Sequence, residues 1–248
     1  MLNMKKILIA ILACSAVLVG TTACGTTEST TSSSNAGTSS SVVSQVTNPD
    51  YQKPEKIATA DDAIKALEAG NKAYQDGNID ISVTDANRKD LYENGQKPYA
   101  VVVTCSDSRV PPELIFNSGL GEIFTIRTAG NVVADFETGS VEYGVDHLGT
   151  PLVVVLGHTN CGAVAGAIEG HAEGHVEDII HDILPSVEQA KQNAKGESEI
   201  ATLAETYNVQ NSINQLKESE ILSKAEQEGK VKIVGAIYDI STGAVKFM

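Results

Sequence analysis

Two short and almost entirely apolar runs constrain the fold of this chain more than any other feature. They are Tyr99–Val103 and Leu152–Leu156, and each directly follows a proline. Valine-rich runs of this length are typical of strands that are buried on both faces, as the strands of parallel sheets are. With helical patterns between and after them, the runs predict an α/β fold: a mainly parallel central sheet flanked by helices, with a C-terminal antiparallel strand or hairpin.

The remaining segments predict helices and strands in alternation. Residues 121–127 and 231–238 have the composition of further strands, and 244–247 is a hairpin partner for the last of these. Residues 76–95 are polar and predict an irregular or briefly helical segment. A helix of about sixteen residues is predicted from Thr59, and a short helix from 110. Further helices are predicted at 134–148 and from Gly162. Residues 200–227 predict one long helix or two.

Side chains that bind soft metals follow the two apolar runs. Cys105 comes two residues after the first run, and His158 and Cys161 follow the second. Ligands collect at the carboxyl ends of parallel strands, so we expect these three side chains to meet at one edge of the sheet. Two thiols and one imidazole suit zinc, and three protein ligands with an open fourth position are typical of catalytic zinc.

Two other interpretations of these residues remain open. Cys105 and Cys161 are candidates for a disulfide, since the N-terminus indicates a compartment that permits disulfides. They are also candidates for inert core cysteines beside a core histidine. His171 and His175, four residues apart, suit a second metal or a proton shuttle, but a solvated acidic helix face is the favoured interpretation of that segment.

The two motifs resemble the signatures of a known family. Cys105-Ser-Asp-Ser-Arg109 followed by Gly157-His-Thr-Asn-Cys-Gly162 is similar to the pair of motifs of the β-class carbonic anhydrases, and Arg127–Asn131 between them also resembles that family. The resemblance covers residues from about 57 to the C-terminus. It implies a carbonate dehydratase with one Zn²⁺ per subunit, held by Cys105, His158 and Cys161.

The resemblance also implies a mechanism. Zinc-bound hydroxide would hydrate CO2 reversibly to bicarbonate and a proton, and activity would climb from neutral towards mildly alkaline pH. Arg109 would hold Asp107, which would orient the hydroxide as the partner in a catalytic pair. If Arg109 released it, Asp107 would become a fourth zinc ligand in a closed state.

Substrate binding departs from the family pattern. Some members place a glutamine beside the metal, but this chain has none between Lys97 and Glu188. The residues considered in its place are Gly162, Asn131, Asn117 and Ser118. The alternatives to a carbonic anhydrase are therefore a hydrolase of carbonyl sulfide or carbon disulfide on the same fold, and a non-catalytic module with a disulfide bond.

The N-terminal residues have the composition of a targeting segment. Two lysines precede an apolar stretch at 7–19, and Cys24 follows small residues, as in bacterial lipoprotein processing sites. We interpret 1–23 as a lipoprotein-type signal peptide, 24–56 as a Ser/Thr-rich flexible tether and 57–248 as the catalytic domain. The predicted location is the outer face of a bacterial cell membrane through a lipid on Cys24, with secretion as the alternative.

Charge excludes some partners. The formal net charge of −14 makes the chain a poor binder of nucleic acid.

The expected partners are CO2 and bicarbonate, and further copies of the chain in a homodimer or a higher homo-oligomer. The helix predicted from Thr59 is a candidate for the subunit contact, or else covers its own core.

Overall fold

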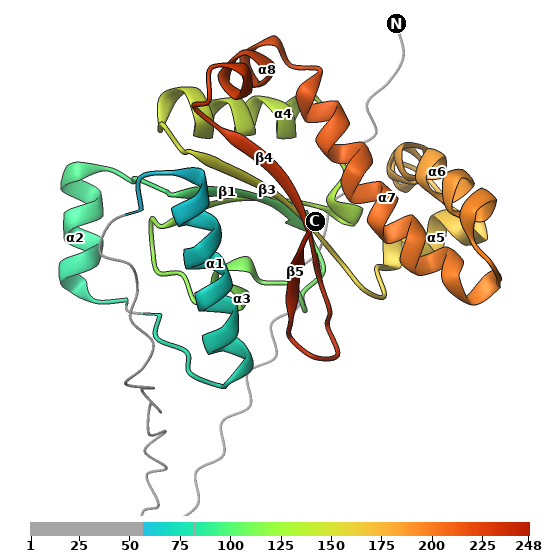
Figure 1. The fold of residues 1–248 in the computed structure, drawn as a ribbon, viewed down its shortest axis with the longest axis horizontal. Coiled ribbons are helices and arrows are strands. Elements are labelled where there is room, and N and C mark those ends of the chain that lie inside the picture. The colour runs from blue at the N-terminus through green and yellow to red at the C-terminus, as the bar shows by residue number, and fades with distance from the viewer. Residues whose placement is uncertain (1–56, 82) are drawn as a thin grey trace, which may run out of the picture. The chain divides into compact units, whose positions relative to one another are not determined.

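The computed structural model describes residues 57–81 and 83–248 (Figure 1). The predicted signal peptide (1–23), tether (24–56) and lipidation site (Cys24) lie outside these residues. Within the described part of the chain, no helix has both the length and the apolar composition needed to span a bilayer.

A five-stranded sheet organises the described residues, with the strand order β2-β1-β3-β4-β5. The first four strands run parallel, and β5 pairs antiparallel with β4. The fold class predicted from the sequence is therefore confirmed. The strands are β1 (Ala100–Cys105), β2 (Ile123–Thr128), β3 (Leu152–His158), β4 (Lys232–Tyr238) and β5 (Val245–Phe247).

The two valine-rich strands are buried on both faces, as their composition predicts. Val102 of β1 and Val154 of β3 pack into the cluster on one face, and Val101 and Val153 pack into the cluster on the other. Every residue of β1 and β3 is buried. This alternation places the central pair of strands between the two apolar clusters.

Helices cover both faces of the sheet. The helix α1 (Ala60–Gln75) begins at the N-cap Thr59 and buries Leu67 against the same cluster as α3 (Pro112–Ile115). On the opposite face lie residues of α4 (Asp135–Glu142), α7 (Glu197–Lys217) and α8 (Glu220–Gln227). The helix α7 also contacts α5 (Gly162–Glu169) and α6 (Val176–Asn193), next to it in Figure 1, and α2 (Asp85–Asn94) carries no buried residue.

Several element boundaries differ from the sequence prediction. The helix predicted over 134–148 is α-helical only to Glu142 and continues as a π-helical turn, η2 (Tyr143–His147). The segment predicted as one helix or two over 200–227 is two helices, α7 and α8, separated at Glu218 and Ser219. A short 3-10 helix, η1 (Ala129–Asn131), follows β2.

The order of the strands creates a switch point in the sheet. From β1 the chain moves to β2 on one side, and then returns to place β3 on the other side of β1. In parallel α/β sheets, ligands bind where the winding direction reverses in this way, at the carboxyl ends of the two strands. Those ends are Cys105 of β1 and His158 of β3.

Candidate metal centre

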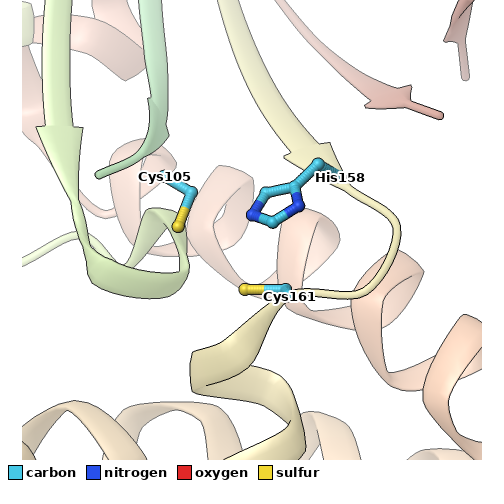
Figure 2. Close-up of side chains that lie close together, drawn as sticks. All are labelled: Cys105, His158 and Cys161. Atoms are coloured by element: carbon cyan, nitrogen blue, oxygen red, sulfur yellow. The ribbon is translucent and has the colours of Figure 1, made fainter. Parts of the chain in front are cut away.

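Cys105, His158 and Cys161 converge at this switch point. One ligand atom from each side chain lies within 4.8 Å of the others, and all three residues are buried. Figure 2 shows the two sulfur atoms and one edge of the imidazole ring pointing toward a common space. The structure therefore brings together the three predicted zinc ligands from separate parts of the chain.

Local structure explains how His158 and Cys161 face the same space. The strand β3 ends at His158, and Thr159 and Asn160 form the connection to α5. Asn160 adopts a left-handed conformation with φ of 55°, which asparagine tolerates better than most residues. The chain turns there, so that Cys161 is the N-cap of α5 and its side chain returns to the end of β3.

The imidazole of His158 is oriented so that Nε2 can bind a cation. Its Nδ1 lies 2.9 Å from the carbonyl oxygen of Thr159, a geometry in which Nδ1–H donates to that oxygen. Nε2 then carries the free lone pair, and it is buried without a hydrogen-bond partner. A buried acceptor without a partner is unfavourable, so this nitrogen is suited to a metal.

The two cysteines receive several backbone hydrogen bonds. The N–H groups of Gly130 and Asp107 point at Sγ of Cys105, at 3.3 and 3.4 Å. Sγ of Cys161 faces backbone N–H groups in the first turn of α5. Such donors favour thiolates, which are the forms that bind metals.

The two thiols influence each other's ionisation. A hydrogen bond with Cys161 is the main cause that lowers the pKa of Cys105, against the opposing effect of burial. The same hydrogen bond with Cys105, together with burial, raises the pKa of Cys161. For His158, burial lowers the pKa, but the neighbouring Cys105 and Thr159 carbonyl outweigh it, so that the pKa is raised. The negative charge of the Cys105 thiolate favours a proton on the His158 ring. The same charge favours a divalent cation in the place of that proton.

The donor set fits zinc. One buried nitrogen and two buried sulfurs are the ligand types that zinc prefers, and three ligands leave a coordination position for a reactant. Both cysteines are free thiols in this structure, so it contains no Cys105–Cys161 disulfide. Among the described residues, no other group of His, Cys, Asp or Glu side chains converges in this way. His171 and His175 are both exposed and do not form such a group.

Asp107 lies beside the cluster and is held by Arg109. The guanidinium donates from Nε to Oδ1 at 3.0 Å and from its terminal nitrogen to Oδ2 at 2.7 Å. This pairing, with the backbone N–H of Arg109, holds the pKa of Asp107 at about 2, although burial opposes it. Arg109 also donates to the carbonyl oxygen of Asn160, next to Cys161. Asp107 is thus paired with Arg109 and is not a member of the ligand cluster in this structure.

Other residues considered from the sequence are engaged elsewhere. Asn117 bonds the backbone of Asn78 and Asp80, and the Ser118 hydroxyl bonds that of Tyr99. The amide of Asn131 donates to Ser212. Gly162 opens α5 directly after Cys161, and a Cβ atom there would meet no other atom within 4 Å.

The structure adds a role for Arg127, which the sequence indicated only as part of a family-like segment, and two residues on α7 that the sequence did not single out. Arg127 donates to the carbonyl oxygens of Cys105 and Asp107, at 3.1 and 2.6 Å. Glu205 and Asn208 on α7 are buried; Glu205 accepts the backbone N–H of Cys161, and Asn208 donates to the carbonyl oxygen of Gly130, whose N–H points at Cys105. The sequence signal that could have identified Glu205 and Asn208 is their position as polar residues on an apolar helix face, which Ala204, Val209 and their neighbours form.

Comparisons with known proteins identify relatives of this chain. The carbonic anhydrase family matches this chain over residues 100–245. Carbonic anhydrase 2 of Mycobacterium tuberculosis is 46% identical over 102 residues, which cover 41% of this chain and 49% of that protein. The chain thus spans about half the length of the first curated relatives that it matches.

Solved structures share the fold. A β-carbonic anhydrase from Coccomyxa in complex with acetazolamide has a TM-score of 0.61 and 28% identity, covering 66% of this chain and 78% of that one. A tetrameric β-carbonic anhydrase from Sordaria macrospora has a TM-score of 0.59 and 26% identity, covering 75% and 93% of the two chains.

Proposed function

We propose that this chain, which belongs to the β-class carbonic anhydrase family, is a zinc enzyme that hydrates CO2 reversibly to bicarbonate and a proton. The convergence of Cys105, His158 and Cys161 at the switch point of the sheet carries this proposal. The free Nε2 of His158 supports it, because no hydrogen bond from the described residues satisfies that nitrogen.

Cys105, His158 and Cys161 would hold the cation, and Asp107 would orient the reactant. A bound zinc ion supplies Lewis acidity, which lowers the pKa of water and provides a nucleophile near neutral pH. Asp107 stays ionised because Arg109 holds its carboxylate. In that form Asp107 can only accept hydrogen bonds, so it accepts one from the attacking water and directs a lone pair at the carbon of CO2.

We assign substrate placement to the first turn of α5. Gly162 follows Cys161 and opens the helix, where backbone N–H groups have no partner within the helix. Such a group suits an oxygen atom of CO2 or bicarbonate. Asn131 is the second proposed contact, and it would first have to leave Ser212.

Metal analysis and a CO2 hydration assay on purified protein test this function. We expect one zinc per chain, hydration of CO2, and inhibition by acetazolamide, which the Coccomyxa relative binds. Turnover of carbonyl sulfide or carbon disulfide in place of CO2 would favour the alternative hydrolase. A protein with neither zinc nor turnover would contradict the proposal.

The proposed location rests on residues 1–56. We propose a signal peptide at 1–23, a lipid on Cys24 and a tether at 24–56 that attaches the domain to the outer face of a bacterial membrane. Cys24→Ser should move the protein from the membrane fraction to the soluble fraction. Equal membrane association of both forms would contradict lipid attachment.

We also propose that the chain assembles into a homodimer or a higher homo-oligomer. Strand β2 is at an edge of the sheet and only partly buried, and Phe136 exposes 89% of its surface at the start of α4. An exposed edge strand and a large exposed aromatic side chain are typical of contact surfaces. The Sordaria relatives are described as tetrameric. Light scattering of purified protein should give the mass of two or more chains, and a monomer would contradict the proposal.

A further inference from the structure

Helix α7 carries three polar side chains on a face that is otherwise buried among apolar residues. They are Glu205, Asn208 and Ser212, which expose 7%, 1% and 1% of their surface. Their spacing of three and four residues places them on one side of the helix. Buried polar groups weaken a fold unless they have hydrogen-bond partners, so the partners of this polar stripe are informative.

Glu205 bonds the segment that carries one cysteine. Its Oε1 accepts the backbone N–H of Cys161 at 3.2 Å. Cys161 precedes α5 directly, so this bond fixes the point from which its side chain extends. The carboxylate is therefore connected to the candidate metal centre through the main chain of a ligand, without belonging to the ligand cluster.

Asn208 and Ser212 bond the segment beside the other cysteine. Nδ2 of Asn208 donates to the carbonyl oxygen of Gly130 at 2.6 Å, and the Ser212 hydroxyl donates to that of Asn131 at 2.8 Å. The N–H of Gly130 in turn points at Sγ of Cys105. Gly130 and Asn131 both have positive φ, of 67° and 49°, so this segment adopts a conformation that needs support from its surroundings.

We infer that Glu205 and Asn208 are positioning residues, which hold the segments around Cys161 and Cys105 at the separation that one zinc ion requires. One rigid helix contacts both segments, although they are distant from each other in the sequence. Apolar residues in place of Glu205 and Asn208 would leave both segments without these bonds. The inference rests on the proposed zinc site and adds residues outside it.

Matched variants test the positioning role. Glu205→Gln keeps an acceptor oxygen in a side chain of the same size, whereas Glu205→Met keeps the length and removes the acceptor. Asn208→Leu removes the donor to Gly130. Glu218→Gln, an exposed change at the end of α7, is the control.

The readouts are metal affinity and cobalt spectra of the full protein. Metal-free protein is titrated with Co²⁺, the thiolate-to-cobalt charge-transfer bands are recorded, and zinc affinity follows from competition with a chelator. We expect Glu205→Met and Asn208→Leu to weaken zinc binding by about 10- to 100-fold and to alter the bands. Glu205→Gln and Glu218→Gln should match the wild type.

Thermal melting of each metal-free variant separates positioning from stability. A lower melting temperature with unchanged zinc affinity and cobalt bands would overturn the inference, since the polar stripe would then only stabilise the fold. Equal loss of affinity in Glu205→Gln and Glu205→Met would also overturn it for Glu205. If Glu205→Met did not fold, the comparison of Asn208→Leu with the wild type would decide whether the polar stripe positions the zinc ligands. A wild type without cobalt bands would overturn the proposed metal centre itself.

Discussion

Asp107 tests the catalytic assignment at the scale of one residue. Its carboxylate is held by Arg109 and lies outside the ligand cluster, so its removal should leave the metal in place. We expect Asp107→Ala to retain one zinc per chain and to lose most of its turnover, by about 10²- to 10⁴-fold. Zinc analysis and stopped-flow CO2 hydration measure the two quantities. Full turnover in this variant would remove Asp107 from the mechanism.

The ion pair of Asp107 also predicts a pH dependence of stability. The pKa of Asp107 is lowered from 3.8 to about 2, chiefly by Arg109, so between these values the unfolded chain binds more protons than the folded one. This contribution is fully present above about pH 4 and is lost as the pH falls through about 2. Denaturant unfolding of metal-free protein should therefore show a smaller difference between wild type and Asp107→Asn at pH 3 than at pH 5. An equal difference at both values would contradict the pairing.

At the scale of elements, two helical glycines predict opposite results. A Cβ atom at Gly70 of α1 would overlap the carbonyl oxygen of Phe116, whereas one at Gly139 of α4 would meet nothing within 4 Å. We expect Gly70→Ala to lower the free energy of unfolding by about 1–3 kcal/mol or more, because α1 must move off its backbone contact. Gly139→Ala should raise it by about 0.5–1 kcal/mol. Urea unfolding measures both, and a stabilising Gly70→Ala would contradict the close approach of α1.

The elements show what the sequence reveals and what it leaves undetermined. Valine-rich runs predicted β1 and β3, because burial on both faces requires apolar residues at every position. The strands extend further than the apolar runs, to Cys105 and His158, because backbone pairing continues past the last valine. The role of the polar stripe of α7 was not predicted: the sequence shows polar residues on an apolar helix face, but their partners are main-chain groups of distant segments, which that pattern does not identify.

At the scale of the whole molecule, a cation at the candidate centre would connect β1, β3 and α5. These elements come together only in the folded chain, so zinc should bind the folded state and stabilise it. Free zinc at 100 times its dissociation constant adds about 2.7 kcal/mol, which corresponds to a shift in melting temperature of about 5–10 °C for a domain of this size. A chelator should remove this shift from the wild type, while Cys161→Ser should melt at the same temperature with or without it. Identical melting of the wild-type protein before and after chelation would mean that no cation joins the three elements.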